Sequence, residues 1–309
     1  MRLDLLAALS GILIAVQSRA NGELAFRLHN SLEAACISFG SGLLVLIVIT
    51  IFHDGIKSGM RKLLKAVESG AIPRWSLIGG ALGGVVIAIQ THVVPLIGVA
   101  IYSVSVISGQ TAVSLLVDRL GLTGGGKRHI SARRITAAVL TVIAVLISVW
   151  DRLDAKNLSV MAIALGILSG GIIGVQRAFN GQVNEHSGQS FATTLLNFIT
   201  GTTLLLLLFA FALVSHQTHL VALRFDPWWM YLGGITGVIY IAFASTVVQH
   251  LGVLTFTLFS VGGQLVGSLL FDIFLPTKSV HVGVYLVTGI FMTYIGVLAN
   301  SERLGRRTS

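Results

Sequence analysis

The chain contains an internal duplication, and this feature constrains its fold more than any other. Residues 9–22 read LSGILIAVQSRANG, and residues 168–181 read LSGGIIGVQRAFNG. Identical positions in this ungapped match are Leu9, Ser10, Gly11, Ile14, Val16, Gln17, Asn21 and Gly22, which recur as Leu168, Ser169, Gly170, Ile173, Val175, Gln176, Asn180 and Gly181. Further along, Trp75, Gly79, Gly80, Gly83, Ala88, Val94, Gly98, Gly109, Gln110, Ser114 and Asp118 recur as Trp229, Gly233, Gly234, Gly237, Ala242, Val248, Gly252, Gly263, Gln264, Ser268 and Asp272. The copies are 159 residues apart in the first match and 154 in the second, so the first copy carries five extra residues.

Both copies are too apolar for a soluble protein. Of the 309 residues, 54% are hydrophobic and only 11% are charged, and the mean hydropathy is +0.87. A helix of about 20 apolar residues crosses the roughly 30 Å of hydrocarbon in a bilayer. Such runs are predicted near residues 5–19, 32–52, 75–94, 97–117, 135–150, 160–176, 191–214, 228–248, 255–275 and 282–299.

Each copy holds five apolar runs, and an odd number means that the second copy enters the membrane from the opposite side. We therefore predict an all-α polytopic membrane protein of about ten transmembrane helices, built as two inverted five-helix repeats. The repeats would cover residues 1–152 and 153–309 and form one membrane domain. Inverted repeats are typical of secondary transporters, which bind substrate near the middle of the membrane. A channel is the alternative, as is a membrane protein that binds a ligand or partner without moving it.

The distribution of positive charge predicts the orientation. Of the 21 Lys and Arg residues, 15 fall on the side of the N-terminus when the ten spans are counted through, and 6 fall on the other side. Because cytoplasmic loops are enriched in Lys and Arg, we expect both termini in the cytoplasm. The basic segment 53–73 has apolar residues at helical spacing, which predicts an interfacial helix on anionic lipid headgroups. A partner-binding role is the alternative for this segment, and the scattered charge gives no indication of nucleic-acid binding.

Three motifs are similar to a known family. They are the Gln-x3-Asn-Gly ending of the first span, the Gly-Gln-x3-Ser-x3-Asp stripe of the fourth span and the Arg-Leu-Gly that follows it. Together they resemble the YdcZ family of bacterial inner-membrane proteins, in the drug/metabolite transporter superfamily. The resemblance covers nearly the whole chain twice, as two fused five-helix units. It implies an inner-membrane exporter with a ten-helix inverted-repeat fold, and it supplies no substrate.

Repeated polar side chains inside the spans are the candidate substrate contacts. Residues spaced by four lie on one helix face, so Gln110, Ser114 and Asp118 form a stripe, which Gln264, Ser268 and Asp272 repeat. Gln110 lies about 12 Å deeper than Asp118, near the middle of the membrane. We expect the substrate contacts to be Gln110, Gln264, Ser114, Ser268, Gln17 and Gln176. The alternative is that these groups only hydrogen-bond helices together.

The same motifs suggest two gates. Asp118 with Gln176 and Asn180 would close the cytoplasmic side. Asp272 with Gln17 and Asn21 would close the outer side, and either carboxylate could bind protons if burial raised its pKa. An ordinary ion pair of Asp118 with Arg119, and Asn-Gly turns at residues 21 and 180, are the alternatives.

Other features limit the chemistry. The small multidrug exporters of the same superfamily use a membrane Glu in their first helix, where this chain has Gln17 and Gln176, so we expect a neutral, zwitterionic or anionic solute. Glu23 and Glu33 are predicted to be solvated loop charges. The segment GLTGGGKR at 121–128 lacks the Ser or Thr of a phosphate-binding loop and follows no strand, so we expect a flexible basic loop. No enzyme signature, cofactor or metal site is expected, and the chain could act as a monomer or a homodimer.

Overall fold

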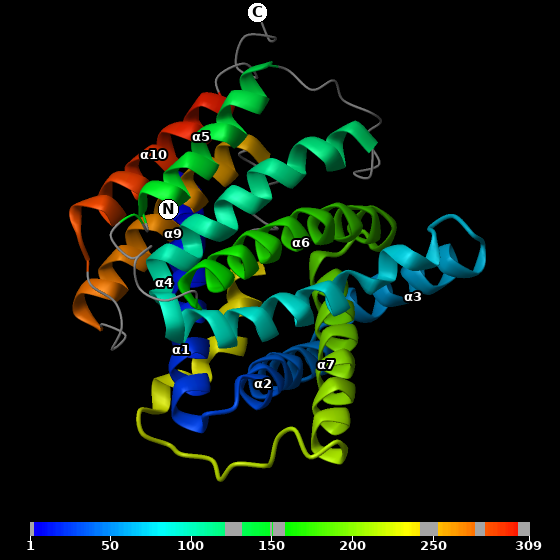
Figure 1. Cartoon of the computed structure of the whole chain (residues 1–309). Helices are drawn as coiled ribbons and strands as arrows, with labels where there is room; N and C mark the ends of the chain where they lie inside the picture. The colour runs from blue at the N-terminus through cyan, green and yellow to red at the C-terminus, as the bar shows by residue number, and fades with distance from the viewer. Residues whose placement is uncertain are drawn as a thin grey trace, which may run out of the picture.

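All regular elements in the described part of the chain are helices, as the fold class predicted from the sequence requires. The computed structural model describes residues 3–120, 132–148, 150, 158–241, 253–275 and 282–301. The first half contains α1 (Leu3–Leu28), α2 (Ser31–Phe52), α3 (Asp54–Glu68), η1 (Arg74–Ile78), α4 (Gly79–Leu120) and α5 (Ala132–Ser148) (Figure 1). The second contains α6 (Leu158–Ser187), α7 (Ser190–Val214), η3 (Trp228–Leu232), the helical residues 233–241, α9 (Val253–Phe274) and α10 (Val284–Ser301). The segment 121–128 lies outside the described residues, and the repeat boundary at 152/153 stays a prediction.

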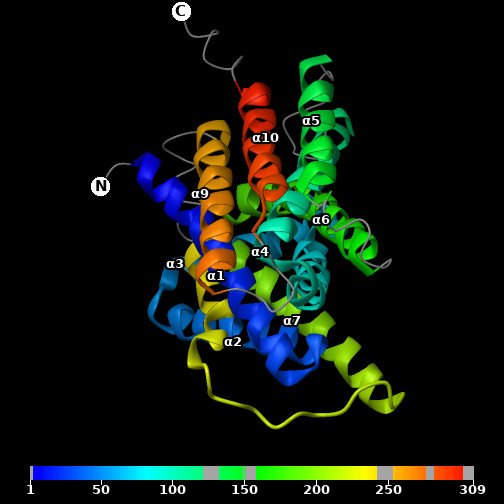
Figure 2. The ribbon, with the colours of Figure 1, turned by 60° about the vertical axis from the view of Figure 1, so that its left-hand side comes forward.

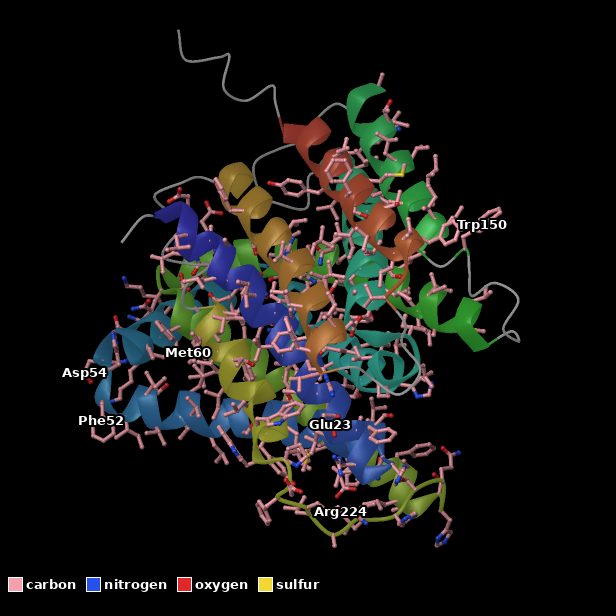
Figure 3. All side chains as sticks on the ribbon, turned by 90° about the vertical axis from the view of Figure 1, so that its left-hand side faces the viewer. Glu23, Phe52, Asp54, Met60, Trp150 and Arg224 are labelled. Carbon is pink, nitrogen blue, oxygen red and sulfur yellow. The ribbon has the colours of Figure 1, made fainter. Side chains whose placement is uncertain are left out.

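Length and composition identify membrane-spanning helices. Within the described ranges, five helical stretches are long and apolar enough to cross a bilayer: 4–28, 31–52, 74–117, 160–187 and 190–214. Shorter apolar helices cover 138–148, 228–241, 259–274 and 284–296. Large apolar side chains such as Phe52, Phe211 and Val214 are exposed, and Phe52 points away from the bundle at the end of α2 (Figure 3). Such a surface suits contact with lipid, so the chain is a polytopic α-helical membrane protein.

The third and fourth predicted spans form one broken helix. The runs 75–94 and 97–117 were expected as separate spans, and they form the two arms of α4, which changes direction between them (Figure 1). Gly98 lies at φ 81° and ψ 170°, a conformation that residues with a Cβ rarely adopt. Pro95, three residues earlier, has no backbone N–H to continue the helical bonding. The two arms of α4 therefore meet at a fixed break.

The two repeats pack through their first and fourth helices, α1 against α9 and α6 against the second arm of α4. At these two helix crossings a Cβ would collide with a backbone carbonyl of the other repeat: at Gly11 with Ser260, at Gly263 with Ala8, at Gly170 with Val106 and at Gly109 with Ile167. Gly11 matches Gly170, and Gly109 matches Gly263, so one close crossing is built twice. Small residues allow helix backbones to approach closely in membranes. The helices α9, α10 and α5 stand side by side, with α10 in the middle (Figure 2).

The basic segment forms an amphipathic helix, α3. Its apolar face, with Ile56 and Leu63, is buried against α6 and α7. Arg61, Lys62 and Lys65 are exposed on the opposite face. The helix therefore lies at the end of the molecule where α6 ends and α7 begins.

Candidate functional site

A central cavity of about 500 Å³ lies between the repeats. Its size falls within the usual range for small-molecule sites, about 300–1,000 Å³. Four of the candidate substrate contacts line it, Gln17 and Gln110 from the first repeat and Gln176 and Gln264 from the second. Asn180 lines it as well. Side chains that are far apart in the sequence thus line the same cavity.

The repeated glutamines and asparagines lie against repeated glycines. A Cβ at Gly83 would lie 2.5 Å from Nε2 of Gln176, and a Cβ at Gly237 would lie 2.9 Å from Nε2 of Gln17. In the same way, Asn180 lies against Gly79 and Asn21 lies against Gly233. The Gln-x3-Asn motif of each first helix therefore packs on a Gly-x3-Gly surface of the other repeat. This explains why both motifs occur twice.

An amide network on the α6 side is centred on Asn197, which the sequence did not single out as functional. The Asn197 Nδ2 donates to Oδ1 of Asn180 at 2.9 Å and to the Thr193 carbonyl at 2.8 Å. The Asn197 Oδ1 accepts from Nε2 of Gln176 at 3.3 Å. The available signal was an amide in the middle of an apolar run, since such groups seldom face lipid.

The matching network on the α1 side uses other residues. Asn21 donates to Oε1 of Gln90 at 2.8 Å, and Gln90 donates to Ser18 at 2.9 Å. Asn21 is completely buried, whereas Asn180, at the matching position, is partly exposed in the cavity. The repeats thus share motifs but differ in environment.

This difference shows at which end the cavity is closed. On α6, cavity-lining residues continue through Asn180 and Gly181 to Asn184. On α1, the last lining residue is Gln17, and Asn21, Gly22 and Ala25 at the matching positions are buried. In the described part of the structure the cavity lining therefore extends to the end formed by α6 and α7, called the open end below, and stops before the end formed by α1, called the closed end.

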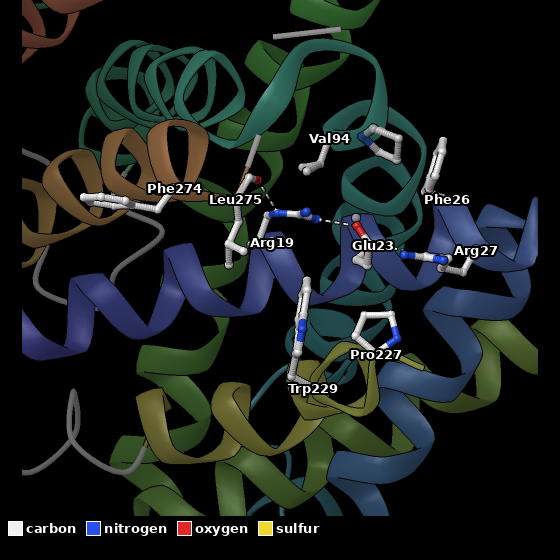
Figure 4. A pocket seen from close by; sticks show the side chains of 11 residues that line it. Arg19, Glu23, Phe26, Arg27, Val94, Pro227, Trp229, Phe274 and Leu275 are labelled. Carbon is white, nitrogen blue, oxygen red and sulfur yellow. Dashed lines mark hydrogen bonds and ion pairs between the residues drawn. The ribbon is translucent and has the colours of Figure 1, made fainter. Parts of the chain in front are cut away.

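A charged cluster lies at the closed end (Figure 4). Arg19 is 7% exposed; its Nη1 lies 2.9 Å from the Glu23 carboxylate, and its Nε donates to the Leu275 carbonyl at 3.1 Å. The guanidinium lies 5.2 Å from the centre of the Trp229 ring, and Arg27 pairs with Glu23 at 2.8 Å. A smaller cavity of about 340 Å³ adjoins these residues. The cluster joins α1, η3 and the end of α9. The positions that match Arg19, Glu23 and Arg27 in the second repeat are Ala178, Gln182 and His186.

The expectation that Glu23 and Glu33 are solvated loop charges was wrong. Glu23 is 9% exposed between Arg19 and Arg27, and Glu33 is 5% exposed. The Glu33 carboxylate accepts from the Val221 backbone N–H at 3.2 Å and from Nδ2 of Asn30 at 3.1 Å. Both partners of Glu23 lie one turn away on its own helix, whereas Val221, a partner of Glu33, is distant in the sequence.

The Asp272 carboxylate lies at the break in α4. It is 2% exposed, and its two oxygens accept from the backbone N–H groups of Val99 at 3.1 Å and Ala100 at 2.8 Å. These groups begin the second arm of α4, so Asp272 caps a helix of the other repeat. Ser268 is completely buried and donates to the Leu265 carbonyl of its own helix. The side chains of Ser114 and Asp118 lie outside the described part of the structure.

The cavity lining is rich in hydrogen-bonding groups and poor in charge. Among the described lining residues, eight carry an amide: Gln17, Gln90, Gln110, Gln176, Asn180, Asn184, Asn197 and Gln264. Hydroxyl groups come from Tyr102, Tyr240, Ser190, Thr193, Thr194 and Ser260, and the one charged residue is Arg177. Across the described ranges, no three His, Cys, Asp or Glu residues are grouped as metal ligands. Since amides both donate and accept, this lining can hold a polar solute reversibly.

Comparison with known families agrees with the duplication. The family model described as "Putative inner membrane exporter, YdcZ" matches residues 3–147 and matches again at residues 161–299. No curated protein matches the chain.

Proposed function

The chain belongs to the YdcZ family of inner-membrane exporters, and we propose that it is a secondary-active carrier that exports a small metabolite by alternating access. The single observation that carries this proposal is the central cavity, which both repeats line with matching glutamines and whose described lining reaches one end of the bundle. In an inverted-repeat carrier, each conformation gives the two repeats different environments, and exchanging those environments produces the opposite conformation. The contrast between buried Asn21 and cavity-lining Asn180 fits one such state.

The substrate would bind among the four glutamines. Gln110 and Gln264 come from the matching fourth spans, and Gln17 and Gln176 come from the matching first helices. An amide in a low-dielectric cavity gains more from a hydrogen bond than it would in water. Ser114 and Ser268 stay predicted contacts, and Ser268 would need to turn away from its own helix.

Opening and closing would take place at the ends of α1 and α6. We propose that Asp118, Gln176 and Asn180 gate the open end and that Asp272, Gln17 and Asn21 gate the closed end. Asp272 supports this proposal because it holds the second arm of α4, which lines the cavity through Gln110. The Arg19 and Glu23 cluster would strengthen closure at that end.

The open end would face the cytoplasm. The excess of Lys and Arg on the N-terminal side supports cytoplasmic termini, and α3 carries exposed Arg61, Lys62 and Lys65 beside α6 and α7. These cations would rest on anionic lipid headgroups. An exporter in this conformation would be ready to take up its cargo from the cell.

The experiment is counterflow in proteoliposomes against a panel of neutral, anionic and cationic metabolites. Wild-type protein should give saturable uptake that is stimulated by the same solute inside the vesicle. The Gln110→Ala/Gln264→Ala double variant should lose most of this flux, because two hydrogen bonds worth about 1 kcal/mol each disappear from the cavity. Gln217→Ala, on an exposed loop, is the matched control.

Other results would overturn the proposal. A conductance far above carrier turnover, without counterflow, would identify a channel. Ligand binding without flux would identify a binding protein. Unchanged flux in the double variant would remove these glutamines from the site.

A further inference from the structure

The charge of the cavity indicates the class of its cargo. We infer that Arg177 binds a carboxylate or similar anionic group on the transported solute, an inference that rests on the carrier function proposed above. Arg177 thereby becomes the residue that distinguishes anionic solutes from neutral ones of the same shape.

Arg177 belongs to the cavity face of α6. The lining residues on this helix are Ile173, Gln176, Arg177, Asn180, Gly181 and Asn184. Their spacing of three and four residues places them on one helix face, toward the cavity. Arg177 is exposed and lies one turn from Asn180. The side chain can therefore meet a solute that enters from the open end.

The charge has no counterpart in the first repeat. The position that matches Arg177 is Ser18, which is completely buried and accepts a hydrogen bond from Gln90. The neighbouring position, Arg19, is the buried cation of the closed end, where Glu23 balances it. Arg177 is thus a difference between two otherwise matching cavity walls, and symmetric packing does not account for it.

Among the described residues, no carboxylate neutralises this charge. No Asp or Glu is among the described residues that line the cavity, and within the described ranges no carboxylate lies within ion-pair distance of Arg177. A cation in the cavity would meet Arg177 and find no counter-charge on the lining described. A carboxylate would pair with the guanidinium, whose fork of N–H donors fits two carboxylate oxygens. The amides of Gln176 and Asn180 lie on the same helix face and can bind the rest of the solute.

The test measures ligand binding by the full chain in detergent, from the shift in its thermal midpoint. The probes are two acids, lactate and gluconate, each beside its neutral amide, lactamide or gluconamide. The variants are Arg177→Gln and Arg177→Lys, with Arg61→Gln on the outer face of α3 as the matched control. At least one acid should bind wild-type protein more tightly than its amide. Arg177→Gln should weaken the binding of that acid by about ten- to one-hundred-fold, the loss expected for a hydrogen bond to a charged group. The affinity for the amide should not change.

Arg177→Lys should keep part of the preference for the acid, and Arg61→Gln should keep all of it. The inference is overturned if neither acid binds wild-type protein more tightly than its amide, or if Arg177→Gln weakens the binding of acid and amide equally. Counterflow in proteoliposomes separates this failure from failure of the carrier. Transport of the amides alone would support the carrier function and contradict the selection of acids by Arg177. Acid binding that depends on Arg177, without any flux, would contradict the carrier function and support the anion site.

Discussion

At the scale of single residues, the molecule combines amides with glycines. A glutamine inside a membrane is costly unless its polar atoms have partners or face a wet cavity. Gln17 and Gln176 solve this by packing on Gly237 and Gly83 while lining the cavity. The missing side chain at each glycine provides the space that the amide occupies.

Replacing Gly83 should therefore impair binding more than folding. In Gly83→Ala, the new Cβ would meet the end of the flexible Gln176 side chain, which can move away without shifting the backbone. The amide would then leave its position in the cavity, and the KM for counterflow should rise up to about tenfold, as expected for one lost hydrogen bond. Gly40→Ala is the control, because its Cβ would meet nothing within 4 Å. An unchanged KM in Gly83→Ala would show that Gln176 does not contact the solute.

Replacing Gly170 should instead impair folding more than binding. In Gly170→Ala, the Cβ would collide with the Val106 carbonyl, which belongs to a helix backbone and cannot move aside. The helices α6 and α4 would separate, and the free energy of unfolding should fall by about 1–3 kcal/mol. Thermal unfolding in detergent measures this change. Gly181→Ala, on the same helix with open space around it, should retain wild-type stability; equal stability of the two variants would contradict the proposed crossing.

At the scale of elements, the broken helix α4 links the repeats. Its first arm carries Gly83, beside Gln176, and its second arm carries Gln110. The break at Gly98 leaves two backbone N–H groups that no helical carbonyl can accept, and Asp272 of α9 accepts both. A shift of α9 relative to α4 would therefore move the second arm of α4 and the cavity-lining Gln110 that it carries.

Asp272→Asn should weaken this connection. The amide keeps the shape of the carboxylate but has a single acceptor oxygen and no charge, so one N–H loses its partner. Stability should fall by about 1–2 kcal/mol, the typical cost of losing a helix cap. The thermal midpoint measures the loss, with Asp54→Asn on exposed α3 as the control. If Asp272→Asn and Asp54→Asn have the same midpoint, the cap is not important for stability.

Much of this arrangement could be predicted from the sequence, because local pattern and duplication carry it. The apolar runs gave the helices, and the repeat placed Gln17, Gln110, Gln176 and Gln264 in comparable positions. The separate runs 75–94 and 97–117 correspond to the two arms of α4, and Pro95 and Gly98 marked the break between them. It also misplaced Glu23, because partners such as Leu275 and Trp229 reach Arg19 only through tertiary packing.

At the scale of the whole molecule, the two ends of the cavity are unequal. The α1 end is closed by an ion pair between nearly buried Arg19 and Glu23. The α6 end has amides and hydroxyl groups along its opening. Removing one partner of a buried ion pair is costly, about 3 kcal/mol or more, because the other charge stays buried. Glu23→Gln should therefore shift the population toward a conformation in which the α1 end is open and hydrated.

The most direct test of alternating access is the reactivity of single cysteines at the two ends, with and without Glu23→Gln. Cys36, the one native cysteine, is first replaced by Ala. Gly181→Cys then reports on the open end, where a side chain meets nothing within 4 Å, and Val94→Cys reports on the closed end, where Val94 is 1% exposed. A water-soluble maleimide should label position 181 rapidly and position 94 slowly. Glu23→Gln should slow labelling at 181 and speed it at 94, whereas rates that stay unchanged or rise together at both positions would contradict alternating access.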